Sequence, residues 1–208
     1  MKKTVSRSLA ARSLAARSLA TLAGAAALAL LLAGCASNDK LANQFRSGDN
    51  KNYIAGDGTV TEFQAPRPGP VEWAGPSDVG GQLSSANLSG VPLVINFWYA
   101  GCAPCRAEAP LLVKLSKEFA GKAQFVGVNV RDTAATANAF ERNFNIEYPS
   151  IIDNSSGSVV LAFTGIVTPQ AVPTTLVIDK TGRVEARILG RADEATLRAL
   201  IQTVVTEK

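Results

Sequence analysis

Hydrophobic and polar residues divide the chain into three stretches of different character. Residues 19–33 are mostly Ala and Leu, and the residues before them include five basic side chains and no acid. The next stretch, up to about residue 59, is rich in Asn, Asp, Ser and Gly, a composition that cannot build a core. Beyond it, apolar runs of strand and helix length recur. The pattern predicts a targeting segment at 1–34, a tether at 35–59 and one folded domain at 60–208.

The apolar pattern of the folded part switches between strand and helix periods. Two runs, 91–98 and 124–130, are almost continuously apolar, which is typical of strands buried on both faces. Other strands are expected at 71–73, 82–83, 150–152, 174–178 and 183–189. Helices are expected at 102–120, 134–143, 158–163 and after the capping residue Asp193. This order predicts an α/β fold, in which helices flank a central mixed sheet and the strands at 71–83 form an N-terminal β-hairpin extension.

Composition and charge exclude several classes of function. The chain has 208 residues and no histidine, which removes Ser-His-Asp and Cys-His pairs and histidine-bearing metal sites. Its 21 basic residues exceed its 17 acidic ones, but five basic residues and no acid lie in residues 1–34. Residues 35–208 therefore carry 21 − 5 = 16 basic against 17 acidic residues, a net charge of −1. A chain of that charge gives no support to nucleic-acid binding.

The first 34 residues read as a secretory signal that ends in a lipid-attachment site. A basic start, an apolar stretch and then Leu32-Ala33-Gly34-Cys35 resemble the bacterial lipobox, in which the cysteine is lipidated and becomes the first residue after cleavage. The alternative is ordinary cleavage near Ala33, which would leave Cys35 as an unpaired thiol in an oxidising compartment. Lipidation predicts a protein anchored at the extracytoplasmic face of the cell membrane.

The pair Cys102 and Cys105 carries the candidate chemistry, and several interpretations compete. A zinc site would need two more ligands, and covalent haem attachment would need histidine where Arg106 stands. A purely structural disulfide would close a very short ring, worth about 2 kcal/mol against about 4.7 kcal/mol for a 100-residue loop. We therefore expect a redox-active pair with no metal and no cofactor beyond the disulfide itself.

The position of the pair, after a buried strand and at the start of a helix, favours redox chemistry. Unpaired amide groups and the helix dipole stabilise a thiolate there. Lowering a thiol pKa from about 8.5 to about 7 raises the thiolate fraction at neutral pH from roughly 3% to one half. We expect Cys102 to be the exposed attacking sulfur and Cys105, one turn later, the resolving one.

Glu108 lies on the same helical stripe as Leu112 and Leu115, so its carboxyl is expected to face inward. A desolvated carboxyl one turn after Cys105 would have a raised pKa and could exchange a proton with that thiol. The alternative is a partly exposed glutamate in the first turn, favoured by the helix dipole. Pro110 indicates either a kink in this helix or a later helix start.

Three motifs together resemble one family: Asn96-Phe97-Trp98, the run from Cys102 to Pro110, and Val172-Pro173-Thr174-Thr175. They are similar to the thioredoxin superfamily, specifically its TlpA/ResA-like membrane-anchored thiol–disulfide oxidoreductases, over about residues 60 to 208. One departure is Gly101, which stands where the family usually has tryptophan. The resemblance implies a thioredoxin fold and a proton-transfer role for Glu108.

The resemblance also implies the residues around the cysteines. Pro173 is expected to form a cis peptide against the sulfurs, and Val172 to offer its backbone to an extended substrate. Trp98 is expected to join these two at the substrate surface. Pro104, Pro110 and Asn96 are expected to be structural residues near the site, with Asn96 where many thioredoxins keep a buried acid.

The function implied is reduction of disulfides in secreted proteins, for example in cytochrome c maturation. The expected partners are protein thiols and disulfides, a membrane thiol-reductant donor and the membrane itself, with the protein a monomer. A disulfide oxidant or isomerase is the main alternative. A peroxiredoxin-like antioxidant lacks its Pro-x-x-x-Thr-x-x-Cys run before Cys102, and a metal-delivery lipoprotein lacks C-x-x-x-C and histidine. A solute-binding lipoprotein would leave the cysteine pair unexplained.

Overall fold

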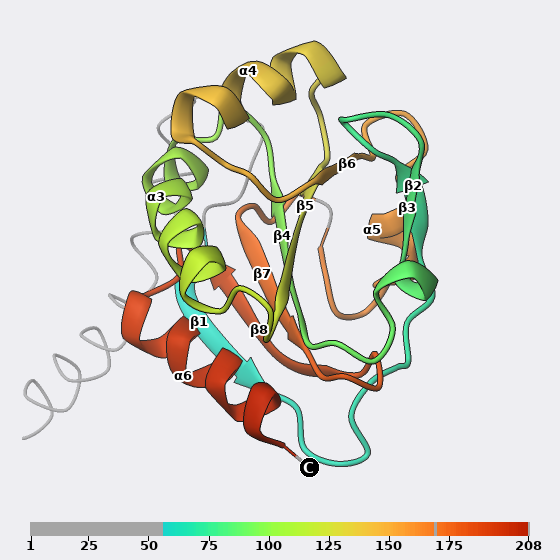
Figure 1. The fold of residues 1–208 in the computed structure, drawn as a ribbon, viewed down its shortest axis with the longest axis vertical. Coiled ribbons are helices and arrows are strands. Elements are labelled where there is room, and N and C mark those ends of the chain that lie inside the picture. The colour runs from blue at the N-terminus through green and yellow to red at the C-terminus, as the bar shows by residue number, and fades with distance from the viewer. Residues whose placement is uncertain (1–55, 169, 208) are drawn as a thin grey trace, which may run out of the picture. The chain divides into compact units, whose positions relative to one another are not determined.

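A computed structural model of the chain describes residues 56–168 and 170–207 (Figure 1). The signal segment, the lipidation of Cys35 and most of the expected tether lie outside the described residues. Within them, no helix has the length and apolar character needed to cross a membrane.

A six-stranded mixed sheet forms the centre of the described domain, with strand order β1-β8-β7-β4-β5-β6. The three strands β4, β5 and β6 are parallel, while β7 is antiparallel to β4, β8 to β7, and β1 to β8. The strands are β1 (Asp57–Glu62), β4 (Leu93–Trp98), β5 (Gln124–Asn129), β6 (Ser150–Ile152), β7 (Thr174–Ile178) and β8 (Val184–Gly190). The predicted α/β architecture with a central mixed sheet is confirmed.

Helices and a small hairpin cover the two faces of this sheet (Figure 1). One face carries α3 (Ala103–Glu118), α4 (Ala134–Phe144) and α6 (Glu194–Thr206). The other carries α5 (Ser158–Ala162) and the hairpin of β2 (Ala74–Pro76) and β3 (Gln82–Ser84), which the 3-10 turn η2 (Ser85–Leu88) follows.

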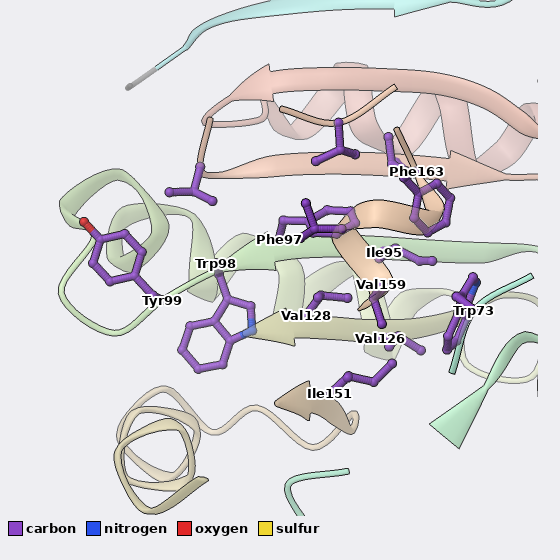
Figure 2. Packing of buried hydrophobic residues seen from close by; sticks show 14 of the residues in the cluster. Trp73, Ile95, Phe97, Trp98, Tyr99, Val126, Val128, Ile151, Val159 and Phe163 are labelled. Carbon is purple, nitrogen blue, oxygen red and sulfur yellow. The ribbon is translucent and has the colours of Figure 1, made fainter. Parts of the chain in front are cut away.

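Successive side chains of β4 point to opposite faces of the sheet, and all six of its residues are buried. Both faces of the sheet must therefore be covered by other elements. Val94 packs in the cluster beneath α3 and α6, whereas Ile95 and Phe97 point to the opposite face and belong to a second cluster, which also includes Trp98 and Phe140. Figure 2 shows that second cluster, in which Phe97 meets Phe163 edge-on at 5.9 Å between ring centroids.

Two expectations about the N-terminal part of the domain need correction. Residues 57–59 were expected to belong to the tether, but they are part of β1 (Asp57–Glu62), so the sheet begins before the expected boundary at residue 60. The hairpin exists, but its first strand is Ala74–Pro76 instead of 71–73. Trp73 is instead a buried core residue whose backbone bonds to Ser85 at the end of the hairpin.

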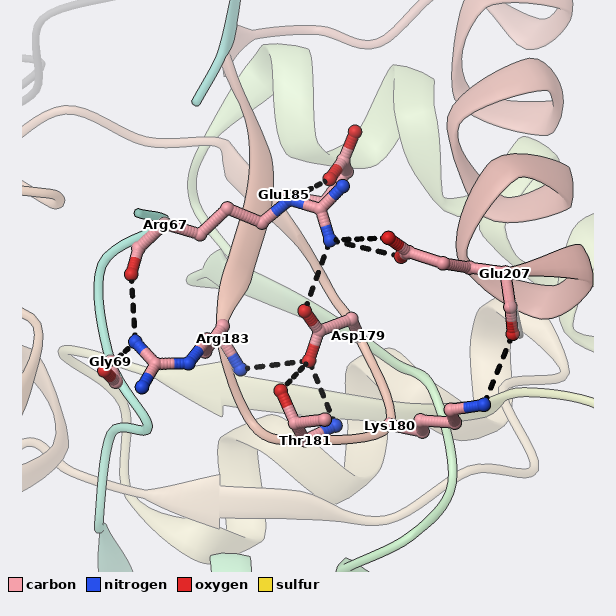
Figure 3. A network of polar contacts seen from close by, with 8 residues as sticks. All are labelled: Arg67, Gly69, Asp179, Lys180, Thr181, Arg183, Glu185 and Glu207. Atoms are coloured by element: carbon pink, nitrogen blue, oxygen red, sulfur yellow. Dashed lines mark hydrogen bonds and ion pairs between the residues drawn. The ribbon is translucent and has the colours of Figure 1, made fainter. Parts of the chain in front are cut away.

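The sheet has two ends, the redox pole and the distal pole. The redox pole is the end at which β4 and β5 finish, β7 begins and α3 starts at Cys102. The distal pole is the opposite end, where β7 finishes. There the Arg67 guanidinium pairs with Asp179, Glu185 and Glu207 (Figure 3). These ion pairs join the segment before β2 to the β7–β8 hairpin and to the end of α6.

Candidate active site

A disulfide joins Cys102 and Cys105 at the start of α3, with their Cα atoms 5.2 Å apart. Cys102 is the N-cap residue of the helix, and the backbone N–H of Cys105 donates to its Sγ at 3.2 Å. This amide is one of the groups that a helix start leaves without an intrahelical acceptor. The same N–H is therefore placed to stabilise a Cys102 thiolate when the disulfide opens.

The loop that carries Cys102 is held from the end of β5. Asp132 accepts the backbone N–H of Ala100 at 2.6 Å and the side-chain amide of Asn129 at 2.8 Å. Asn129 is fully buried, and its own side-chain oxygen accepts the backbone N–H of Asp132 at 2.7 Å. Two polar residues, one ending β5 and one just after it, thus hold the backbone that precedes the disulfide.

The expectation that Cys102 is exposed is wrong for this oxidised form, because its exposed fraction is 0% and that of Cys105 is 3%. The carbonyl oxygen of Val172 lies 3.9 Å from the Cys102 Sγ. That contact joins positions 70 residues apart in the chain. The peptide bond between Val172 and Pro173 is cis, as expected.

An aromatic ring lies beside Gly101 even though the usual tryptophan is missing. A Cβ atom at this glycine would come within 3.2 Å of the Cε2 atom of Tyr99. The Tyr99 ring is mostly buried, and the Arg131 guanidinium carbon lies 4.6 Å from its centroid. Tyr99 therefore takes up space next to Gly101 from two positions earlier in the chain.

Glu108 is fully buried and faces the sheet, as expected. Its Oε1 accepts the backbone N–H of Ala192 at 3.1 Å and the Thr175 hydroxyl at 3.4 Å, and its Oε2 accepts the Asn96 amide at 3.4 Å. Burial raises the pKa of Glu108 to about 7, and the bonds from Ala192, Thr175 and Asn96 limit the rise. The carboxyl therefore titrates near neutral pH.

Trp98 does not lie at the substrate surface. Only 4% of it is exposed, and its ring packs on Phe140 of α4 with centroids 4.4 Å apart. Trp98, Asn96 and Cys105 instead line a small cavity behind the disulfide, together with Tyr148. This correction follows from strand alternation, because Trp98 points to the same side of β4 as Asn96 and Val94.

The two expected prolines are structural residues of α3. Pro104 lies in the first helical turn, where its missing N–H costs no intrahelical bond. Pro110 lies inside the helix, which begins before it and continues past it, so the alternative of a later helix start is wrong.

Several residues of the site were not predicted from the sequence. Thr175 and Ala192 both bond to Glu108, yet they come from β7 and from the segment after β8. Asn129 and Asp132 support the cysteine loop, and Tyr99 lies beside it. Asn129 is a polar residue at the end of an apolar strand, and this feature of the sequence could have indicated that it supports the cysteine loop.

No group of three or more Cys, Asp or Glu side chains among the described residues could hold a metal ion. The described site offers instead a disulfide at a helix start, a cis-proline backbone against its first sulfur, and a buried carboxyl one turn beyond its second. Dithiol–disulfide exchange is the chemistry that these groups support. Fold and site together define a thiol–disulfide oxidoreductase of the thioredoxin type.

Comparison with known proteins identifies the family. The chain belongs to the AhpC/TSA family, whose model matches residues 59–187. It is 24% identical over 126 residues to the thiol-disulfide oxidoreductase ResA of Bacillus cereus, covering 60% of this chain and 70% of that protein.

Solved structures agree with this assignment. A DsbF homologue from Corynebacterium diphtheriae superposes with a TM-score of 0.64 and 30% identity, covering 73% of this chain and 96% of that one. A secreted thiol-disulfide isomerase from Corynebacterium glutamicum superposes with a TM-score of 0.64 and 27% identity, covering 74% and 97%. The relatives thus include proteins described as secreted.

Proposed function

We propose that this chain is an extracytoplasmic, lipid-anchored reductant of protein disulfides. The observation that carries the proposal is the buried Glu108 carboxyl, bonded to β4, to β7 and to the segment after β8, one helical turn beyond Cys105. A group that titrates near neutral pH is suited to take a proton from a buried thiol as a disulfide forms. Similarity to ResA supports the same class of reaction.

In the first step, the Cys102 thiolate attacks one sulfur of the substrate disulfide. A bond forms between Cys102 and that sulfur, the substrate disulfide breaks, and the other substrate sulfur leaves as a thiolate that takes a proton from solvent. The Cys105 amide that now bonds to the Cys102 Sγ would stabilise the attacking thiolate. Reduction of the Cys102–Cys105 disulfide by a donor would require the site to open, because Cys102 is fully buried in the oxidised form.

In the second step, Cys105 passes its proton to the Glu108 carboxylate and attacks the Cys102 sulfur. The Cys102–Cys105 disulfide forms, the mixed disulfide breaks, and the second substrate sulfur leaves as a thiolate. Two electrons have then passed from the protein to the substrate. Glu108 returns its proton to solvent before the next cycle.

The backbone of Val172 is proposed to bind the substrate beside the reacting sulfur. Its carbonyl oxygen already lies 3.9 Å from the Cys102 Sγ. An extended peptide that pairs with this backbone would bring its own cysteine to the same place.

The direction of transfer and the partners are further parts of the proposal. A thiol-reductant donor in the membrane would reduce the Cys102–Cys105 disulfide again after each cycle. Secreted proteins that need free cysteines, such as apocytochrome c before haem attachment, would be the substrates. The protein would act as a monomer with no cofactor other than its own disulfide.

The catalytic roles are tested by insulin reduction with dithiothreitol as the electron source. Cys102→Ser is expected to abolish catalysis, because no attacking thiolate remains. Cys105→Ser is expected to form a stable mixed disulfide with substrate that mass spectrometry detects, because no resolving thiol remains. Equal activity of Cys102→Ser and the unmodified protein would reject the mechanism.

A disulfide isomerase or oxidant is the second candidate, favoured by the similarity to a secreted thiol-disulfide isomerase. The reduction potential of the Cys102–Cys105 pair separates the two. A value near about −270 mV supports a reductant, as for thioredoxin, and a value near about −120 mV supports an oxidant.

Lipid anchoring at Cys35 is tested by metabolic labelling with a radioactive fatty acid. The unmodified chain is expected to incorporate label into the membrane fraction, and Cys35→Ala to incorporate none. Label that survives the substitution would reject attachment at this cysteine.

A further inference from the structure

The turn of the β2–β3 hairpin is docked on an edge of the central sheet (Figure 1). The backbone N–H of Asp78 donates to the carbonyl oxygen of Ser150 at 2.9 Å, and the Ser150 N–H donates to Asp78 Oδ1 at 2.8 Å. Their neighbours Ser77 and Ile151 form an antiparallel bridge. Because β6 is the last strand in the sheet order, these contacts cover backbone groups that an edge strand would otherwise leave unpaired.

Asp78 also joins this turn to α4. The side-chain amide of Asn138 donates to the carbonyl oxygen of Asp78 at 3.3 Å. Elsewhere in the hairpin, a Cβ atom at Gly75 would overlap the side chain of Ile151, so β2 lies directly against β6. The hairpin turn, the edge strand and the helix therefore meet at Asp78.

Glu141 of α4 lies one helical turn after Asn138 and lines a hollow of about 460 Å³ together with Asp78. The exposed residues Arg142 and Glu147 line the same hollow. Only 7% of Glu141 is exposed, and its Oε1 has no hydrogen-bond partner within the described part of the chain. A buried carboxylate oxygen without a donor is unfavourable, whereas a carboxyl that carries a proton can donate to a neighbouring acid. The arrangement therefore favours a proton between Glu141 and Asp78.

The electrostatic surroundings of Glu141 favour the same pairing. Burial and the Asp78 carboxylate raise the pKa of Glu141 to about 7, while the Ser150 hydroxyl and the Arg142 guanidinium limit the rise. Two acids at such close range resist ionisation of both, because like charges repel in a site with little water. The pair therefore keeps one proton up to about neutral pH.

Two further titratable groups lie near Glu141, on the segment between α4 and β6. Glu147 lines the hollow, but its carboxylate is paired with the Lys117 ammonium group at 3.0 Å. Burial raises the pKa of the Tyr148 hydroxyl, so this group stays protonated where carboxyls titrate. The charge that changes near neutral pH at this place is thus that of Asp78 and Glu141.

We propose that Asp78 and Glu141 form a proton-operated latch, which holds the hairpin turn on β6 while the two carboxyls share a proton and releases it when both are ionised. With the proton present, one carboxyl donates to the other. When the proton leaves to solvent, two negative charges face each other and the contact becomes repulsive. Release uncovers the outer backbone edge of β6, which the turn otherwise protects from pairing with other chains. The latch is independent of the chemistry of Cys102 and Cys105.

The pKa of Glu141 gives the direction and size of the effect. This pKa is about 7 with the turn docked, against an ordinary value of 4.5 for a glutamate in water. The docked state holds the proton more tightly, so its stabilisation is complete below pH 4.5 and is lost as pH rises through about 7. From pH 6 to pH 8, the equilibrium constant for docking is expected to fall by about threefold to tenfold, the larger value applying where release fully restores the ordinary pKa.

Amide hydrogen exchange of the oxidised protein, followed by NMR at pH 6 and pH 8, tests the latch. The reporters are the amides of Asp78 and Ser150, and each measured rate is divided into the intrinsic rate at that pH to give a protection factor. Amides of β4 report unfolding of the whole domain. The reporters are expected to be less protected than β4, which shows local release, and their protection is expected to fall by about threefold to tenfold from pH 6 to pH 8.

Glu141→Gln is expected to remove this fall, because an amide side chain carries no charge at either pH. Asp78→Asn should remove it as well, while keeping an oxygen that accepts the Ser150 N–H. Glu147→Gln, an exposed change in the same hollow, is the matched control and should keep the fall. Unchanged protection in the unmodified protein, an equal fall in Glu141→Gln, or reporters as protected as β4 would each overturn the latch.

Discussion

A fully buried carboxyl one helical turn after Cys105 gives this protein a group that titrates near neutral pH. Glu108 takes three hydrogen bonds, yet burial still raises its pKa to about 7. An ordinary glutamate on the surface would be ionised throughout the physiological range. The proposed exchange reaction is therefore expected to depend on pH through Glu108.

Glu108→Gln is expected to lower kcat/KM for insulin reduction about tenfold or more, because the amide cannot take the Cys105 proton. The unmodified enzyme should also show a titration near pH 7 in this rate, and the variant should lack it. Glu118→Gln, an exposed change on the same helix, is the control and should keep both rate and profile. A pH profile left unmoved by Glu108→Gln would reject the proton-transfer role.

The same pKa makes stability depend on pH. Glu108 has an ordinary pKa of 4.5 in the unfolded chain and about 7 in the fold, so the folded state holds the proton more tightly. Its contribution is complete below pH 4.5 and is lost as pH rises through about 7. At about 1.36 kcal/mol for each pKa unit, the loss is at most about 3 kcal/mol.

Glu108→Gln is therefore expected to stabilise the oxidised protein at pH 8.5 relative to the unmodified chain, and to give no such gain at pH 4. Urea unfolding at the two pH values measures the difference. A gain of the same size at both values would show that packing, and not ionisation, is responsible.

At the scale of elements, segments with an apolar pattern could be predicted from sequence, including the short edge strand β6, whereas the polar edge strand β1 could not. The buried strand β4 and the helix α6, capped by Asp193, lie where their apolar patterns place them. Strand β1 was missed because it lies at the sheet edge and carries mainly polar residues, DGTVTE, which resemble a tether in composition. The face on which Trp98 lies was also missed, since a strand buried on both faces gives no alternation to read.

The candidate site divides in the same way. The cysteine pair follows from a local motif and the inward Glu108 from helical spacing, whereas the cis peptide at Pro173 was implied by the family resemblance. The Cys102 sulfur lies against the Val172 carbonyl oxygen, and the partners of Glu108 come from separate strands. Such contacts join positions far apart in sequence, so no local pattern could predict them.

The Arg67 network joins three elements at the distal pole and is expected to stabilise the fold without affecting catalysis. Asp179 and Glu185 have side chains only 8% exposed, so loss of Arg67 would leave buried acids without their cation. Discounted for the partial exposure of Arg67, the expected cost of Arg67→Ala is about 2 kcal/mol in urea unfolding.

Lys117→Ala is the matched control, because it removes an ion pair with Glu147 whose two side chains are 57% and 72% exposed. Its cost is expected to stay below about 0.5 kcal/mol. Insulin reduction should be unchanged in both variants, since neither residue belongs to the redox pole. Equal stability of the two variants would show that the network adds nothing beyond a surface ion pair.

At the scale of the whole molecule, net charge would report whether the proposed leader is removed. The unprocessed chain has 21 basic and 17 acidic residues and an isoelectric point of about 9.1. The proposed cleavage before Cys35 would remove five basic residues and no acid, which would leave 16 against 17. Burial also raises the pKa of Glu108 and of Glu141 to about 7, so both carboxyls are partly neutral at that pH.

The processed native protein is therefore expected to focus near neutral pH, about two units below the precursor. Cys35→Ala should block lipidation and the cleavage that depends on it, so the variant should accumulate near the precursor position. Native isoelectric focusing of membrane extracts measures both forms, and focusing in urea should move the processed form to lower pH, because unfolding returns Glu108 and Glu141 to ordinary pKa values. If the unmodified protein from membranes focused at about 9.1, the predicted cleavage before Cys35 would be wrong.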